Sequence, residues 1–300
     1  MSTSIAETLE QSRAKRERER AVKKGIQLTI SHILLSIGAL VMIFPLLWLI
    51  SSSFKLDNEI FSKNFSLIPR DFTLENFSKG WYANPQYSFL HFFINTIVLV
   101  SGVIIGNMIS CSMTAFGIAR LKLPGHTLVL SIVLMTLMLP GQVTLIPQYL
   151  MFSKLNWLST FRPFIIPAFM STQSFFVYML VQFMRGIPGE LDESAKIDGA
   201  SPFRIYFSII LPLCKASLCS VAIFSFIWTW NDFLGQLIYL NEVRSYTVSL
   251  ILNSLVDATS KSSWGSLMAL TLISISPCCI LYFSLQKYFV EGIATSGLKG

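Results

Sequence analysis

The chain has 300 residues, of which 53% are hydrophobic and only 13% are charged. A soluble domain usually has about a quarter of its residues charged, and it needs that polar surface to cover its core. The composition therefore excludes an ordinary cytosolic enzyme, a disordered protein and a secreted disulfide scaffold. It leaves an integral membrane protein with several spans.

The five cysteines and three histidines predict neither a metal site nor a disulfide framework. No two cysteines form a C-x-x-C pair, and the cysteines lie in or beside apolar stretches. Cysteines in such surroundings usually behave as small buried hydrophobes. The histidines are far apart and show no metal-ligand spacing. We therefore expect this chain to bind no cofactor of its own.

The chain begins with a polar segment, residues 1–25, which we predict to be a cytoplasmic tail. The part from Arg13 to Lys24 carries seven basic residues interleaved with two glutamates, which is compatible with a short solvated helix. The apolar stretch that follows, residues 26–50, holds no Lys, Arg, Asp or Glu. As a helix it would be about 37 Å long, enough to cross a hydrocarbon core of about 30 Å with some tilt.

Hydropathy predicts an all-α, polytopic membrane protein with six transmembrane helices in one domain, residues 26–289. Pro140 and Gly141 interrupt the third span, and Pro147 is expected to close it. The second span contains Gly102-x-x-x-Gly106, a spacing that lets helix backbones approach closely. A cytoplasmic loop is expected at residues 185–212 and a cytoplasmic C-terminal tail at 290–300. The six spans are predicted at about 26–50, 89–116, 127–146, 163–183, 213–237 and 264–289.

The distribution of basic residues predicts the orientation of these spans. With both termini inside, 15 of the 23 Lys and Arg residues are cytoplasmic and 8 are outside. This bias follows the positive-inside rule. Topology therefore accounts for the net charge of +7, and no nucleic-acid partner is required.

The loop at residues 185–212 has the residue pattern of two short helices joined by a corner. Pro188 can begin the first helix, in which Asp192 and Lys196 are spaced to form an i,i+4 pair. Gly199 supplies a stop, and Ser201 followed by Pro202 suits the start of a second helix. Such a compact protrusion could dock into a cleft of a partner. From the pattern alone, an ordinary solvated loop is slightly favoured over such a docking element.

The same loop resembles the EAA loop of permease subunits of binding-protein-dependent ABC importers. The family pattern is Glu-Ala-Ala, two residues, Asp-Gly-Ala, eight residues, then Ile-x-Leu-Pro, and the spacing here is identical. Ser194 replaces the first Ala of the pattern. The matching residues are Glu193, Ser194, Ala195, Asp198, Gly199, Ala200, Ile209, Leu211 and Pro212. The resemblance implies that these residues couple the chain to an ATPase.

Other stretches resemble the carbohydrate-uptake, maltose-type subfamily of these permeases. They are Pro69, Thr73 and Asn76; Asn95; Ala119-Arg120; Trp230-Asn231-Asp232-Phe233; and Gln286 to Gly292 with the terminal Lys299-Gly300. The subfamily implies a second six-span permease, two ATPase subunits, an extracytoplasmic solute-binding protein and a sugar as cargo, with an oligosaccharide as the preferred kind. It also implies a multi-pass protein among the lipids of a prokaryotic plasma membrane. The chain contains no Gly-Lys dipeptide, so ATP and Mg are expected on the partner ATPase.

Several polar residues are candidates for the translocation path. Asn231 and Asp232 lie near the outer end of the fifth span, about 25 Å beyond Lys215. Ionisable groups in spans usually face a cavity or a partner, although Asp232 could instead lie in the outer interface. Interrupted helices often line transport sites, although the break at Pro140-Gly141 could be a structural kink. Further candidates are Gln142, Asn107 and Trp228, which could equally pack between helices.

Three other functions compete with a sugar permease. A membrane-embedded enzyme would need His, Asp, Glu or Cys clustered at one depth, and no such cluster is evident in the sequence. A self-contained secondary transporter would more often show repeated halves, and it would leave the cytoplasmic loop without a role. A permease of the same family that imports a polyol or a glycerol phosphodiester is the nearest alternative.

Overall fold

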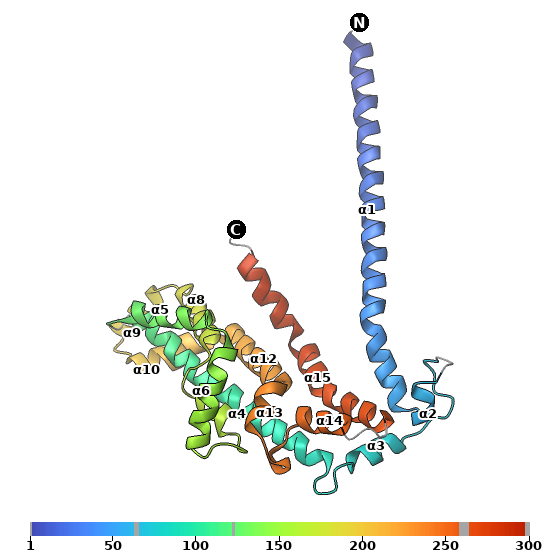
Figure 1. Cartoon of the computed structure of the whole chain (residues 1–300). Helices are drawn as coiled ribbons and strands as arrows, with labels where there is room; N and C mark the ends of the chain where they lie inside the picture. Colours follow the sequence, from blue (N-terminus) through green and yellow to red (C-terminus); the bar gives the residue numbers. More distant parts are fainter. Residues whose placement is uncertain (1, 63–65, 122–123, 258–263, 298–300) are drawn as a thin grey trace.

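The computed structural model describes residues 2–62, 66–121, 124–257 and 264–297. Side chains are described for residues 23–62, 66–121, 124–256 and 264–284. Within these residues the chain is helical and contains no strand (Figure 1). The predicted all-α class is therefore confirmed.

The first helix, α1 (Ser2–Ser53), joins the predicted tail and the first span in one continuous element. Its 52 residues give it a length of about 78 Å at 1.5 Å per residue. It stands apart from the rest of the molecule in Figure 1, and its large apolar side chains from Ile26 to Leu47 are exposed. Near its end, α1 packs against α15 (Trp264–Gly297). The apolar surface of α1 is thus left for lipid or another polypeptide.

The second predicted span corresponds to one helix, α4 (Phe89–Phe116), which is the central helix of the body. Two short helices, α2 (Asp57–Ile60) and α3 (Glu75–Trp81), precede it. A π-helical turn, η1 (Gly117–Leu121), continues α4. Four helices pack closely on α4: α7 (Arg162–Ala168), α8 (Ser174–Arg185), α12 (Lys215–Asn231) and α14 (Val248–Asp257).

The glycines of the predicted G-x-x-x-G motif let α7 lie directly against α4. A Cβ at Gly102 would lie 2.7 Å from the side chain of Ile165. A Cβ at Gly106 would lie 3.0 Å from the backbone carbon of Ala168. Backbone atoms cannot move aside as a flexible side chain can, so this contact requires glycine at Gly106.

The predicted fourth span is not one helix, because residues 169–173 separate α7 from α8. Ser171 in this break has a φ of 55°. Side chains on α4 bond to the backbone there: the Ser110 hydroxyl donates to the Ala168 carbonyl (2.6 Å) and accepts from the Ser171 N–H (3.2 Å). Thr114 and Ser171 also share a hydrogen bond of 2.7 Å between their hydroxyls. These contacts replace lost helical bonds, which is what allows irregular backbone inside a membrane protein.

The predicted third span is interrupted where expected but does not end where expected. α5 (His126–Leu137) and α6 (Gly141–Lys154) meet at Pro140 with a bend of 101°. Pro147 does not close the span, because α6 continues through it to Lys154. Pro147 lies in the second turn of α6, where its missing N–H removes only one helical bond.

The predicted fifth span is divided at Asp232 into α12 and α13 (Phe233–Tyr239). The Asp232 carboxylate accepts a hydrogen bond of 2.9 Å from the Gly235 N–H, which makes Asp232 the N-cap of α13. A 3₁₀ turn, η3 (Val243–Ser245), then leads to α14. The segment between α8 and α12 contains α9 (Glu190–Ile197), α10 (Pro202–Ile205), the π-turn η2 (Tyr206–Ile210) and α11 (Leu211–Leu213).

Three helical stretches in the described residues are long and apolar enough to cross a membrane: Lys23–Ser53, Phe89–Leu121 and Trp264–Ser284. The count rises to five if each of two bent helix pairs forms one span. The prediction of six spans therefore stays a prediction. The predicted C-terminal tail belongs largely to α15, which runs to Gly297, whereas residues 298–300 and the side chains of 285–297 lie outside the described part.

Candidate functional site

The segment from Arg185 to Leu213 has the local structure that its sequence predicts. α9 begins at Glu190, two residues later than Pro188 suggested. Gly199 has a φ of +79°, a left-handed conformation that glycine adopts without strain. The Ser201 hydroxyl accepts a hydrogen bond of 3.3 Å from the Arg204 N–H, and Pro202 occupies the first position of α10. Two short helices therefore meet at a fixed corner.

Arg120, in η1 at the end of α4, attaches this segment to the body. Its Nε donates to Asp192 Oδ2 at 2.7 Å, and the two side chains are only 7% and 12% exposed. The same guanidinium donates to the carbonyls of Met184 (3.1 Å), Ile187 (2.7 Å) and Pro188 (3.0 Å). One planar fork thus joins α4, the end of α8 and the first turn of α9.

The predicted pair between Asp192 and Lys196 is wrong, because Asp192 binds Arg120 instead. Lys196 is exposed, whereas Asp192 is buried and faces the body. The resemblance includes Arg120 in the Ala119-Arg120 match but implies no contact for it. The pair could not be predicted from local spacing, because Arg120 and Asp192 are 72 positions apart in the chain.

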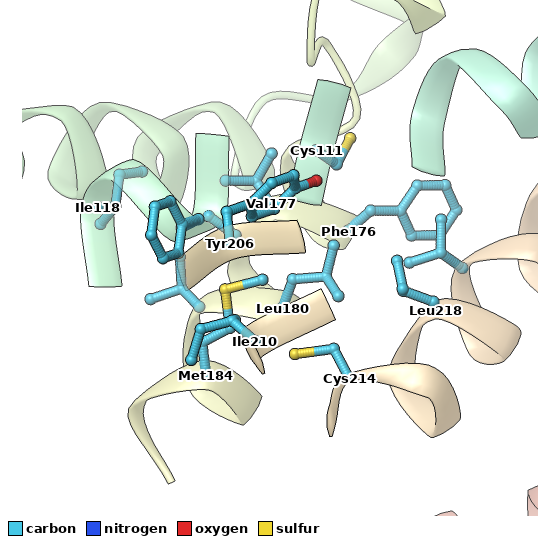
Figure 2. Close-up of a cluster of buried hydrophobic side chains, with 14 of the residues drawn as sticks. Cys111, Ile118, Phe176, Val177, Leu180, Met184, Tyr206, Ile210, Cys214 and Leu218 are labelled. Atoms are coloured by element: carbon cyan, nitrogen blue, oxygen red, sulfur yellow. The ribbon is translucent and has the colours of Figure 1, made fainter. Parts of the chain in front are cut away.

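A buried apolar cluster lies beneath the segment and connects it to three long helices. Figure 2 shows Met184, Tyr206, Ile210 and Cys214 close to one another in this cluster. The cluster also takes in side chains of α4, α8 and α12, among them Cys111, Val177, Leu180 and Leu218. Burial of so much apolar surface holds the segment against the body as a unit.

Tyr206 adds a polar contact inside this cluster. Its hydroxyl lies 2.7 Å from that of Ser112 on α4, and either group can donate. Burial raises the pKa of the Tyr206 phenol above its ordinary value, so the hydroxyl keeps its proton at neutral pH. The hydrogen bond links η2 to α4.

The residues of the predicted EAA pattern divide into a buried and an exposed set. Ala195 is buried in the cluster, and Ala200, Ile209 and Leu211 pack against it. The exposed set is Glu193, Ser194, Asp198, Gly199 and Pro212. The buried set anchors the segment, and the exposed set remains available to a partner.

Two large apolar side chains stand among the exposed polar residues, and sequence reasoning missed them. Ile197 is 86% exposed and Phe203 is 68% exposed. They lie on either side of the Gly199 corner, at the end of α9 and in α10. Exposed apolar groups at a rigid corner are typical of a surface that binds another protein.

The predicted path residues are distributed over several helices. Asn107 on α4 is buried and donates to the Ser225 hydroxyl on α12 at 3.0 Å. Trp228 on α12 stacks on Phe176 at 5.0 Å between ring centroids, yet remains 44% exposed. The other members are Asn231, exposed at the end of α12, Asp232, the N-cap of α13, and Gln142, exposed in the first turn of α6.

Two asparagines singled out by the resemblance fasten the other end of the molecule. Asn76 is buried, and its Nδ2 donates to the carbonyls of Ser53 (3.0 Å) and Lys55 (2.7 Å) at the end of α1. Asn95 Nδ2 donates to the carbonyls of Arg244 and Tyr246, each at 2.9 Å. Both residues hold connecting segments against long helices. The terminal run from Gln286 lies outside the described side chains.

The sequence matches a family model described as the binding-protein-dependent transport system inner membrane component, over residues 106–295. The chain belongs to this family. The match covers the whole segment from Arg185 to Leu213 together with Arg120. It confirms the predicted membership among permease subunits of binding-protein-dependent ABC importers.

Alignments with individual relatives support this assignment and cover nearly the whole length of each relative. The sn-glycerol-3-phosphate transport system permease protein of Brucella abortus is 28% identical over 269 residues, or 88% of this chain and 95% of that protein. The galactooligosaccharides transport system permease protein of Bacillus subtilis is 29% identical over 279 residues, which cover 93% of this chain and 98% of that protein.

A solved structure shares the fold. It is a crystal structure of a bacterial ABC transporter involved in the import of the acidic polysaccharide alginate. The matched chain has a TM-score of 0.79 and 21% sequence identity, covering 88% of this chain and 96% of that one.

Proposed function

We propose that this chain is one of two permease subunits that import a sugar, preferably an oligosaccharide, delivered by an extracytoplasmic binding protein. A second six-span permease would complete the pathway, and two ATPase subunits carrying ATP and Mg would drive it. The relative named for galactooligosaccharide transport supports the cargo. The relative named for sn-glycerol-3-phosphate transport is compatible with the alternative, a permease of the same family that imports a polyol or a glycerol phosphodiester, but does not favour it.

The rigid attachment of the segment from Arg185 to Leu213 is the observation that carries the coupling role. Arg120 and the buried cluster connect it to α4, α8 and α12, so a push on the segment moves these helices together. The exposed Ile197 and Phe203 provide the apolar anchors for an ATPase surface. ATP-driven movement of that surface would then rock this chain against its partner permease.

The proposed topology follows from the same assignment. If the segment from Arg185 to Leu213 faces an ATPase, its side of the membrane is the cytoplasm, and both termini lie there too. The exposed apolar side chains of α1 would then contact lipid or the partner permease. A multi-pass location in a prokaryotic plasma membrane with six spans fits this arrangement.

The proposed path runs along α12 toward its outer end. Trp228 offers an exposed ring on which a sugar can stack, and Asn231 and Asp232 follow at the helix end. Asn107 and Gln142 would contribute farther along. Asp232 also caps α13, so its role in the path needs a test that separates the two functions.

Reconstitution of the complete transporter tests the proposal. The chain is purified with its partner permease, ATPase and binding protein in lipid vesicles, and ATP-dependent uptake is measured. The solutes are a radiolabelled galactose oligosaccharide, a neutral polyol and sn-glycerol 3-phosphate. Uptake of the oligosaccharide supports the main proposal, and uptake of either other solute alone supports the alternative. Uptake that needs no ATPase would contradict both.

A further inference from the structure

A cavity of about 560 Å³ lies at the end of α4 opposite to Arg120. The start of α4 lines it with His91 and Asn95, and the segment after α6 lines it with Ser159 and Phe161. The segment around η3 adds Glu242 and Arg244. Its volume lies within the range of sites that bind small molecules, about 300–1,000 Å³. In the proposed topology this cavity opens outside the membrane.

Hydrogen bonds between its walls hold the cavity in shape. His91 Nε2 lies 2.8 Å from the Arg244 carbonyl, to which Asn95 Nδ2 also donates at 2.9 Å. The opposite wall is fixed by a hydrogen bond of 2.7 Å from the Ser159 N–H to the Tyr239 carbonyl. The backbone of the walls is therefore preformed, and a ligand would have to order only the side chains that contact it.

The side chains of Glu242 and Arg244 are free to contact a ligand. Both are exposed, and neither makes a hydrogen bond or ion pair with the residues that the structure describes. Only the backbone carbonyl of Arg244 is used in holding the wall. The cavity thus presents a strong acceptor and a strong donor, and the half-buried Phe161 also lines it.

We propose that this cavity binds a neutral sugar and forms an outer subsite between release from the binding protein and entry into the path. Each sugar hydroxyl both donates and accepts, so it needs a lining with both kinds of group. The negative charge of Glu242 and the positive charge of Arg244 offset each other. The cavity therefore has little net charge from this pair, which favours a neutral solute over a phosphate or a cation. Phe161, which lines the cavity, adds an apolar contact for the apolar side of a sugar. The inference rests on the proposed function.

The test compares Glu242→Gln and Arg244→Ala with controls that the proposed topology places on the same side of the membrane. Asp71→Asn and Arg70→Ala are matched controls, because both side chains are exposed and lie outside the cavity. Binding of the neutral sugar imported in the uptake assay is measured by saturation-transfer NMR. The sample is the permease–ATPase complex in nanodiscs, without binding protein. Each cavity variant should weaken binding about tenfold, since a hydrogen bond to a charged group contributes that much.

A second readout separates a sugar subsite from a surface for the binding protein. The concentration of binding protein that half-maximally stimulates ATP hydrolysis should stay unchanged in the cavity variants. A shift in that concentration with unaltered sugar binding would overturn the inference and assign the cavity to protein docking. Equal sugar binding in cavity and control variants would also overturn it. Uptake of sn-glycerol 3-phosphate alone would overturn the inference that the cavity binds a neutral sugar. A complex that imports none of the tested solutes would instead contradict the proposed function itself.

Discussion

Arg120 and Asp192 form a buried ion pair of 2.7 Å between the end of α4 and the first turn of α9. The two Nη groups of Arg120 donate hydrogen bonds to three backbone carbonyls, at the end of α8 and just before α9. The second carboxylate oxygen, Oδ1, has no hydrogen-bond partner among the described residues. The pair is therefore set up to position the segment, because one bond fixes the acid and the remaining donors fix the chain around it.

Removing one partner should release the segment from the body. Arg120→Ala leaves a buried carboxylate uncompensated, which costs about 3–5 kcal/mol of stability when a buried pair is broken. Hydrogen exchange of residues 186–200 should rise strongly, and thermal unfolding of the purified complex should begin at lower temperature. Arg120→Lys should not restore protection, since a single ammonium cannot bond to all four acceptors.

The exposed pair between Lys79 and Glu75 provides the control. These side chains are 56% and 58% exposed at a separation of 3.1 Å. Exposed pairs contribute about 0–1 kcal/mol, so Lys79→Ala should leave stability and exchange unchanged. An Arg120→Ala variant that behaved like Lys79→Ala would show that the buried pair does not hold the segment.

Replacing Gly199 should uncouple ATP hydrolysis from uptake. Gly199 has a φ of +79°, where a β-branched side chain is strained by about 1–2 kcal/mol. Nothing lies within 4 Å of a Cβ placed there, so the effect comes from the backbone alone. Gly199→Val should insert normally into the membrane, yet lose uptake and the stimulation of ATP hydrolysis by the binding protein.

Gly199→Asn is the matched variant, because asparagine tolerates the left-handed conformation. It should retain most of the uptake that Gly199→Val loses. Both variants are measured in the same vesicles, with membrane insertion checked by fractionation. Normal uptake with valine at this position would contradict the coupling role of the corner.

Substituting Gly106 should loosen the contact between α4 and α7. A Cβ there would lie 2.9 Å from the ring of Phe169 and 3.0 Å from the backbone of Ala168. Gly106→Ala should therefore destabilise the protein by about 1–3 kcal/mol, as overpacking does. Gly117→Ala is the control, since a Cβ there meets nothing within 4 Å. Equal thermal unfolding of the two variants would rule out a tight helix contact.

Features set by neighbouring residues could be predicted from the sequence. The bounds of α4 follow from a long apolar run between polar segments. The corner at Gly199 and the cap at Ser201 follow from local backbone preferences, which need no partner from elsewhere in the chain. The broken helix at Pro140 belongs to the same class, because proline itself disturbs the helix.

Features that depend on contacts between distant residues could not be predicted. In the sequence, Lys196 is a plausible partner for Asp192. In the structure Asp192 instead pairs with Arg120, 72 residues away, and both side chains of this pair are buried. The break between α7 and α8 lies in an apolar stretch that hydropathy assigns to one span. It exists because hydroxyls of Ser110 and Thr114 on α4 bond to the residues of the break. Neither contact leaves a periodic signal in the sequence.

Asp232 provides the test of the proposed translocation path, because capping and transport make different demands on its side chain. Asn caps a helix nearly as well as Asp, whereas loss of a cap to Ala costs about 1 kcal/mol. Asp232→Asn should therefore unfold at the same temperature as the wild type, and Asp232→Ala should unfold at a lower one.

If the carboxylate lines the path, Asp232→Asn should also reduce the maximal uptake rate, because it keeps the cap but removes the charge. The binding protein should stimulate ATP hydrolysis as before, since the segment from Arg185 to Leu213 is unchanged. Full uptake by Asp232→Asn, together with a stability loss confined to Asp232→Ala, would assign Asp232 to capping alone.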